Sequence, residues 1–318
     1  MIKKIIDKIH NSKSFLITAH MNLEGDALGS ELATYLLLKK LKKKVIICNN
    51  DPTPRIYGFL PRANIIRNTL DDEVFDVAIV LDCSDSSRAG RVKDYLSRAK
   101  SIINIDHHIS NTNFGDMNWV DPAASSVAQM IYKIASNLKI MDRRIAICLY
   151  TGIYTDTGNF TYANTKPETL NISAKLMSYN INPHDIYVKL HSSCQLEDLK
   201  FMGKVVSSLK FDISRRICWA PITRWREGNY DLTEVLFSIM RLLKGVEVFI
   251  LFKKAGKNKI RVNFRSRSSV DVNRVAKFFG GGGHKRASGT TMEDTLESAQ
   301  KKVITFVRRY TNGSRLRK

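Results

Sequence analysis

The chain has 318 residues, of which 43% are hydrophobic, so it can form packed cores in two domains, and global disorder is excluded. Lysine and arginine number 51 against 30 acidic residues, and the resulting net charge of +21 favours anionic partners such as nucleotides, nucleic acids or acidic surfaces. The five cysteines are odd in number and form no CxxC pair, which disfavours a disulfide framework and a thiolate zinc site and favours a reducing, cytoplasmic location.

The N-terminal half alternates short apolar runs with amphipathic helical patterns. Runs at 15–19, 45–48, 77–81 and 102–105 are rich in Val and Ile, as is typical of parallel strands buried on both faces. A helix is predicted at 30–43, and further helices are predicted at 126–138, 142–155 and 167–179. This alternation predicts a doubly wound α/β domain with a parallel sheet over residues 1–185.

A different pattern begins after a predicted connector at residues 186–200, which holds no clear strand. Runs at 217–222, 246–252 and 260–265 predict strands, and the last alternates apolar with polar residues, so that one face should be exposed. A helix at 272–279, a glycine-rich loop and a final helix at 294–310 follow. We therefore expect a second, smaller α/β domain over residues 201–318.

Acids and histidines follow three of the predicted strands directly. They are His20, Glu24 and Asp26 after the first strand, Asp82 and Asp85 after the third, and Asp106, His107 and His108 after the fourth. Asp156, at the end of a predicted helix, is a further candidate. Because ligands bind at the carboxyl ends of the strands in open α/β sheets, we expect these side chains to meet at one edge.

A cation would explain why such residues gather. Clustered carboxylates repel one another and are costly to bury, and a cation removes both penalties. Carboxylates with a few imidazoles and no thiolate suit Mn²⁺ or Mg²⁺ better than structural zinc. Four carboxylates are more than one ion needs, so the pattern predicts a two-metal site that activates water for attack on phosphorus. Each piece alone has a plainer explanation, since an Asp at a strand end is often a helix cap.

These motifs resemble those of the DHH phosphoesterase family in order and spacing. The resemblance is carried by His20-x-x-x-Glu24-x-Asp26-Ala27, Asp82-Cys83-Ser84-Asp85, Asp106-His107-His108 and Thr155-Asp156-Thr157-Gly158. The segment from Gly280 to Gly289 resembles the signature of the DHH-associated substrate-binding domain. Within the family, the chain most resembles the bifunctional oligoribonuclease/pAp phosphatases of the nanoRNase A type.

The resemblance implies a role for each of the candidate residues in the first domain. The implied ligands are His20, Glu24 and Asp82 for one Mn²⁺ ion, and Asp26, the bridging Asp82, His107 and Asp156 for the other; Mg²⁺ and Co²⁺ are alternatives. His108 would lie beside the phosphate as a hydrogen-bond donor or acid, and Asp106 would orient a histidine. The family commonly has Pro-Asp where this chain has Leu23-Glu24. We expect activity to be retained, because Glu keeps the charge of Asp.

The resemblance also implies a substrate-binding set. Its members are Ser126, Arg265, Gly282, Gly283, His284, Lys285 and Arg286. Glycines let backbone amides approach an anion, and a guanidinium can clamp a phosphate. The alternatives are a flexible linker for the glycines, ordinary surface charge for Arg265, and a helix cap for Ser126.

The resemblance implies a metal-dependent hydrolase of phosphoester bonds. Its substrates would be RNA oligonucleotides of a few residues, converted to mononucleotides, and pAp, converted to AMP. Alternatives within the family are a cyclic- or linear-dinucleotide phosphodiesterase and a single-strand exonuclease. An alternative of another class is a basic nucleic-acid-binding protein with a decayed site, which the charge of +21 supports. No apolar run approaches the ~20 residues of a membrane span, so no membrane partner is expected, while monomer and homodimer both stay open.

Overall fold

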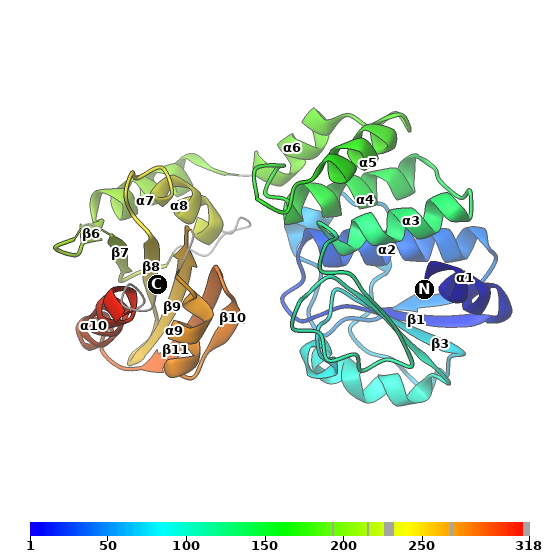
Figure 1. Ribbon diagram of the computed structural model, residues 1–318, viewed down its shortest axis with the longest axis horizontal. Coiled ribbons are helices and arrows are strands. Elements are labelled where there is room, and N and C mark those ends of the chain that lie inside the picture. The colour runs from blue at the N-terminus through cyan, green and yellow to red at the C-terminus, as the bar shows by residue number, and fades with distance from the viewer. Residues whose placement is uncertain (193, 215, 226–231, 268–269, 314–318) are drawn as a thin grey trace. The chain divides into compact units, whose positions relative to one another are not determined.

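The computed structural model describes residues 1–192, 194–214, 216–225, 232–267 and 270–313, which belong to two compact units divided between Ser192 and Ser193 (Figure 1). We call these unit 1 and unit 2. The division falls within the predicted connector, of which Ser193 lies outside the described residues. Much of this segment is helical, because α6 (Pro183–His191) and α7 (Leu196–Ser207) reach into it from either side.

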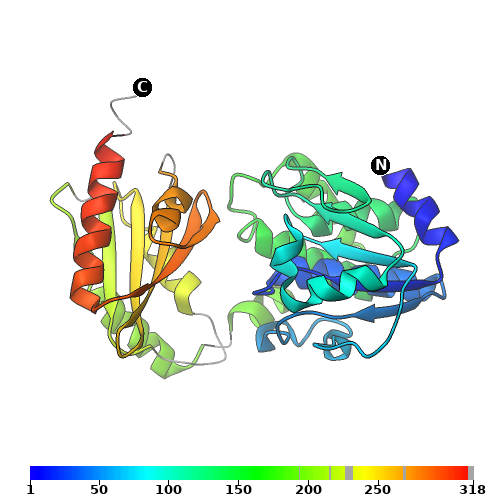
Figure 2. The same cartoon turned by 90° about the horizontal axis from the view of Figure 1, so that it is seen from below.

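Unit 1 contains a parallel sheet (Figure 2). Its strand order is β2-β1-β3-β4-β5. Its strands are β1 (Ser14–Thr18), β2 (Lys44–Ile47), β3 (Val77–Leu81), β4 (Ile102–Asp106) and β5 (Met117–Val120). The predicted α/β fold with a parallel sheet is confirmed. The edge strand β5 was not predicted, because its four residues are only half-buried and lack the Val/Ile run of the inner strands.

Helices cover both faces of this sheet, and alternate residues along a strand enter different cores. Phe15 and Ile17 of β1 pack in the larger core, whereas Leu16 belongs to the smaller one. The larger core is covered by α1 (Ile2–Asn11), α2 (Gly25–Lys40), α3 (Val127–Asn137) and α4 (Arg143–Asp156), and α5 (Pro167–Met177) packs beyond them. The smaller core lies under η3 (Ser86–Arg98), and the short helices η1 (Arg55–Tyr57) and η2 (Ala63–Ile65) lie between β2 and β3 in the chain. The helices α1 and η3 were not predicted from the sequence.

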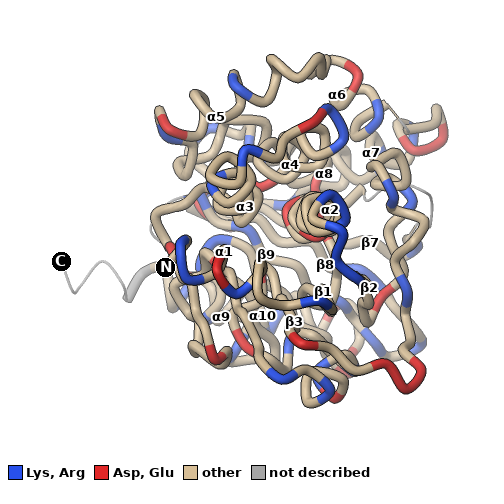
Figure 3. Tube along the Cα trace, turned by 90° about the vertical axis from the view of Figure 1, so that its right-hand side faces the viewer, with Lys and Arg blue, Asp and Glu red and all other residues tan. Residues whose placement is uncertain are grey.

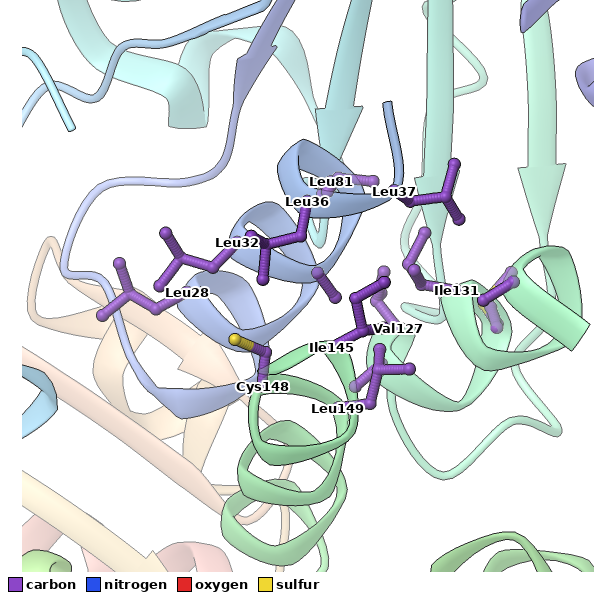
Figure 4. Close-up of a cluster of buried hydrophobic side chains, with 14 of the residues drawn as sticks. Leu28, Leu32, Leu36, Leu37, Leu81, Val127, Ile131, Ile145, Cys148 and Leu149 are labelled. Carbon is purple, nitrogen blue, oxygen red and sulfur yellow. The ribbon is translucent and has the colours of Figure 1, made fainter. Parts of the chain in front are cut away.

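The close packing of α2 on α4 brings two predicted metal ligands together. A Cβ atom at Gly29 would lie only 2.4 Å from the carbonyl oxygen of Cys148, so this contact requires glycine. Leucines of α2 lie beside Ile145, Cys148 and Leu149 of α4 (Figure 4). Because the helices run antiparallel, the start of α2, with Asp26, lies next to the end of α4, with Asp156.

The other end of α2 carries a run of lysines. Lys39 and Lys40 lie in its last turn, and three more lysines follow at 42–44, after Leu41. Blue segments mark these lysines at the end of α2 in Figure 3. Positive charge at a helix C-terminus stabilises the helix dipole. The cationic and acidic ends of α2 are therefore separated by the length of the helix.

Unit 2 has a mixed sheet with the order β10-β11-β9-β8-β7-β6. Its strands are β6 (Lys210–Phe211), β7 (Ile217–Ile222), β8 (Val248–Gly256), β9 (Lys259–Ser266), β10 (Gly282–His284) and β11 (Ala287–Glu293). Only β7 and β8 pair in parallel. The helices α7 and α8 (Leu232–Met240) cover one face, and α9 (Val272–Phe278) and α10 (Leu296–Gly313) cover the other (Figure 1).

The prediction of a glycine-rich loop was wrong for its second half. Gly282–His284 forms β10 and pairs with Ala287–Gly289 of β11. The absence of side chains is what allows this pairing, because a Cβ at Gly283 would lie 2.6 Å from the carbonyl oxygen of Ala287. Among the described residues of the chain, no helix has the length and apolar character that a membrane crossing needs.

Candidate functional site

The acids and histidines of unit 1 come together at the carboxyl edge of three neighbouring strands. β1, β3 and β4 lie side by side in the sheet, and His20, Asp82 and Asp106 lie at or just after their ends. These residues form three groups, and within each group the possible ligand atoms lie within 4.8 Å of one another. The groups are His20, Glu24 and Asp82; Asp26, His107 and Asp156; and Asp82, His107 and His108. All of the residues predicted as metal ligands therefore belong to one cluster.

Asp82 lies at the centre of this cluster. Its Oδ2 atom is 3.3 Å from Nε2 of His20, and its Oδ1 atom is 3.5 Å from both Nε2 of His107 and Nδ1 of His108. Its backbone is left-handed, with φ of 52°, which is uncommon for a residue with a side chain. One carboxylate thus faces both halves of the cluster, the arrangement that a bridging ligand requires.

The other carboxylates of the cluster are fixed by backbone groups at helix ends. Asp26 accepts hydrogen bonds from the backbone N–H groups of Val127 (2.6 Å) and Ala128 (2.8 Å), at the start of α3. Glu24 is the N-cap of α2, and its Oε1 accepts from the N–H groups of Asp26 and Ala27. Glu24 therefore caps α2 while its carboxylate remains in the cluster.

The three histidines are each oriented by an oxygen atom. Nδ1 of His108 donates to Oδ1 of Asp106 at 2.7 Å, and Oδ2 of Asp106 in turn accepts from Asn111 at 2.6 Å. Nδ1 of His20 lies 2.6 Å from the carbonyl oxygen of Met21, and the corresponding contact of His107 is to Ala124. These contacts direct Nε2 of His20 and of His107 toward Asp82.

The pKa values of several acids and histidines in the cluster are shifted by burial and by their charged neighbours. Burial raises the pKa of Asp26 well above its ordinary range, and it raises the pKa of Asp156 to about 8. Burial acts to lower the pKa of His20, but the adjacent Asp82 outweighs it and raises that pKa to about 9. For Asp82 burial acts upward, yet the neighbouring imidazoles hold its pKa below the ordinary value.

The burial and the donor atoms of the cluster can be compared with what a divalent cation needs. Several carboxylates are buried at costs that a cation would remove. The Oδ1 atom of Asp82 is buried and accepts no hydrogen bond from any residue that the structure describes. The donors are carboxylate oxygens and imidazole nitrogens, which suit Mn²⁺ and similar ions. The cluster therefore fits a metal site.

Some residues near the cluster were not predicted from the sequence. Arg88 is half-buried in the first turn of η3, donates to Oγ of Ser84 at 3.3 Å, and forms no ion pair with any described acid. Its carbonyl oxygen accepts from the N–H of Met21 at 2.7 Å, which ties it to the loop that carries His20. Asn164 donates to both the backbone and the side chain of Asp156. No motif marked these residues, because their contacts cross between loops.

Two residues of the predicted set have other contacts. Asp85 caps η3 by accepting from the N–H of Ser87 at 2.8 Å, and it belongs to none of the three ligand groups. Ser126 is fully buried, and its hydroxyl caps α3 by accepting from the N–H of Gln129 at 3.1 Å. The structure therefore favours the capping alternative for Ser126 over contact with a phosphate.

The remaining predicted substrate-binding residues lie together in unit 2. Arg265 on β9 pairs in register with Ala287 on β11, next to the turn that holds Lys285 and Arg286. The side chains of His284, Lys285 and Arg286 are exposed. Arg265 forms an ion pair with Glu234 and lies over the ring of Phe237, so a phosphate at this guanidinium would compete with a carboxylate.

Each of the two units contains a segment that matches a known domain family. Residues 14–153 match the model of the DHH family, N-terminal domain, and residues 229–312 match the DHHA1 domain. The bifunctional oligoribonuclease and PAP phosphatase NrnA of Thermus thermophilus is 32% identical over 92% of this chain and 88% of that protein. The NrnA protein of Bacillus subtilis is 28% identical, over 92% of this chain and 93% of that protein.

One solved structure shows the same fold over nearly the whole chain. An exopolyphosphatase-related protein from Bacteroides fragilis superposes with a TM-score of 0.90 and 26% identity, covering 97% of this chain and 96% of that one. The sequence motifs, the two domain matches and the relatives that cover most of the chain all indicate the same family. The chain therefore belongs to the DHH family of phosphoesterases, with an N-terminal DHH domain and a C-terminal DHHA1 domain.

Proposed function

We propose that this chain is a metal-dependent phosphoesterase that hydrolyses short oligoribonucleotides to mononucleotides and pAp to AMP. The observation that carries the proposal is the shared carboxylate of Asp82, which faces two groups of ligand atoms at once. The substrates are inferred from the names of the NrnA relatives, which are similar over nearly the whole chain. We place the activity in the cytoplasm, because all five cysteines are free thiols, which persist in a reducing compartment.

The residues of the cluster divide into two sets around Asp82. We infer that His20, Glu24 and Asp82 hold one divalent cation, and that Asp26, Asp82, His107 and Asp156 hold another, with Mn²⁺ the best match to these donors. Such cations supply Lewis-acid chemistry, since they withdraw charge from phosphoryl oxygens and make water more acidic. Glu24 serves in place of the usual Asp because its Oε1 caps α2 while the carboxylate stays beside His20 and Asp82.

Two further side chains of unit 1 act on the phosphate. Asp106 accepts the Nδ1 proton of His108, so Nε2 is the ring atom that would give a proton to, or accept one from, a phosphate oxygen. Arg88 would bind a phosphate oxygen, because a half-buried guanidinium that forms no ion pair with a described acid is suited to an anion. We also infer that Lys285, Arg286 and Arg265 of unit 2 attract substrate phosphates.

A substrate panel tests the proposal. Purified protein with Mn²⁺ should release mononucleotides from a diribonucleotide and AMP from pAp, measured by chromatography. Linear pApA, a cyclic dinucleotide, pyrophosphate and long single strands separate the other activities of the family. Asp82→Asn should abolish hydrolysis, and Asp85→Asn, a nearby carboxylate outside the ligand groups, should retain it.

The competing function is that of a basic nucleic-acid-binding protein with a decayed site. The net charge of +21 favours it, whereas the complete ligand cluster opposes it. Tight, salt-dependent binding of long RNA with no hydrolysis of any member of the panel would decide for this alternative.

A further inference from the structure

A stack of aromatic rings reaches the surface of unit 2 on the side covered by α9 and α10. The rings of Phe278 and Phe306 stack with centroids 4.1 Å apart and an interplanar angle of 22°. Tyr310, one helical turn further along α10, continues the column at 6.3 Å and 8°. Phe279 packs edge-on against both phenylalanines. The column is therefore built into the helix packing and has a defined ring orientation.

The outer member of this column is exposed. Phe278 is 65% exposed, although a phenylalanine placed only to fill a core would be buried. One face of its ring rests on Phe306, so the exposed area belongs to the rest of the ring. A flat ligand could stack on Phe278 and extend the column by one ring.

The helices that carry the column are strongly cationic. Together α9 and α10 contain six lysines and arginines and one acid, Glu297. Lys277 directly precedes Phe278, and Arg309 follows Phe306 at the spacing of one helical turn. The side chains of Lys277 and Arg309 are exposed. Two other cations of these helices, Arg274 and Lys302, pair with Asp271 and Asp294. The surface thus combines an open ring with positive charge.

We propose that this surface binds single-stranded nucleic acid, with a base stacked on Phe278 and the backbone phosphates beside Lys277 and Arg309. Stacking of bases on aromatic side chains, combined with nearby cations, is how proteins bind single strands without reading sequence. The positive charge of α9 and α10 favours an anionic ligand over an uncharged apolar partner. The inference goes beyond the proposed function, because this binding needs neither the metal ligands nor hydrolysis.

Binding is measured by fluorescence anisotropy with a labelled single-stranded RNA of about 12 nucleotides, on the full chain and with chelator present to prevent cleavage. Phe278→Ala should weaken binding about 5- to 150-fold, the range expected for the loss of one stacked base. Phe278→Trp should bind as tightly as the wild type or tighter. Phe278→Leu, which keeps an apolar side chain but no ring, should behave as Phe278→Ala does.

Two controls separate stacking from general effects. Leu242, which is 83% exposed in the same unit, provides a matched apolar truncation, and Leu242→Ala should leave the affinity unchanged. Lys277→Gln and Arg309→Gln should each reduce the slope of log Kd against log salt concentration by about 0.7. Equal affinity of Phe278→Ala and the wild type would overturn the proposal. So would concentration-dependent self-association of the wild type that Phe278→Ala removes, because the surface would then bind a second copy of the chain.

Discussion

In unit 1 the carboxylates of Asp26, Asp82 and Asp106 are buried, whereas in unit 2 the side chains of Lys285 and Arg286 are exposed. Asp26 and Asp106 are held by hydrogen bonds from a helix end and from loop residues, and Asp82 lies among three histidines, so the positions of these groups are set by the fold. The exposed cations keep their rotamer freedom and act through charge, which is weaker in water but tolerant of position. We therefore expect substitutions in the buried cluster of unit 1 to cause large losses of kcat or kcat/KM. Substitutions of the exposed cations of unit 2 should cause small increases in KM.

The largest effect is expected at Asp82. Asp82→Asn removes the charge that faces both ligand groups, and we expect activity to fall by about 10³-fold or more with the fold intact. The measurement is kcat/KM on a diribonucleotide, with circular dichroism to check the fold. Asp85→Asn should stay close to the wild type, since Asp85 bonds to Ser87 and Thr112 and belongs to none of the ligand groups. Comparable losses in both variants would mean that burial in the cluster is not what sets the size of the effect.

Metal removal should destabilise unit 1, because the cluster would again hold uncompensated buried acids. Mn²⁺ at about 100 times its Kd should add about 2.7 kcal/mol of stability, or roughly 5–10 °C in the melting temperature. Burial raises the pKa of the Asp156 carboxyl to about 8. Asp156→Asn puts a neutral amide of the same shape in its place. At neutral pH the metal-free wild type must protonate this carboxyl in order to fold, so the metal-free variant should melt above it. The variant should also show a much smaller increase with Mn²⁺. A full increase would remove Asp156 from the ligand set.

The same contrast explains what could be predicted from the sequence. His20, Asp82 and Asp106 were predicted to meet because each follows a strand with a clear apolar run, and parallel strands place such positions at one edge. The contacts that hold these side chains were not predictable. Asp26, for example, accepts from Val127, which is 101 residues away in the sequence. No local pattern marks such a contact.

Unit 2 was harder to predict for a related reason. The glycines at 280–283 fit a flexible loop as well as a strand, and only the pairing of Gly282–His284 with β11 decides between them. Phe278 is another case, since an aromatic residue at a helix end is expected to be buried, and its exposure depends on where Phe306 lies in the folded unit. Sequence patterns thus located the chemistry of the buried site better than that of the exposed surface.

A substitution at Asp106 tests whether a residue that positions the histidine beside the phosphate can be separated from the metal ligands. Asp106→Asn removes the acceptor that orients His108, and we expect kcat to fall about 10- to 100-fold. The increase in melting temperature with Mn²⁺ should be unchanged, because Asp106 belongs to none of the ligand groups. If the variant loses the metal-induced stabilisation, Asp106 would have to be counted with the ligands.

Arg88 tests whether unit 1 also contacts the substrate directly. Arg88→Met keeps much of the side-chain volume and removes the charge, and kcat/KM should fall by about 10-fold or more, as expected for a lost charge-assisted hydrogen bond. Stability should change little, because the backbone contact with Met21 does not depend on the side chain. An unchanged kcat/KM would remove Arg88 from the groups that bind the phosphate.

The smallest effect is expected for the exposed cations of unit 2. Lys285→Ala should raise KM by a factor of about 1.5 to 5 and leave kcat nearly unchanged, because one exposed charge contributes about 1 kcal/mol or less to anion binding. The effect should shrink as salt is added, since exposed charges are screened. Lys257→Ala, in the turn between β8 and β9 and away from the β9 end that carries Arg265, is the matched control and should have no effect. A large loss of kcat in Lys285→Ala would place this lysine among the groups that must be held in a fixed position, as those of unit 1 are.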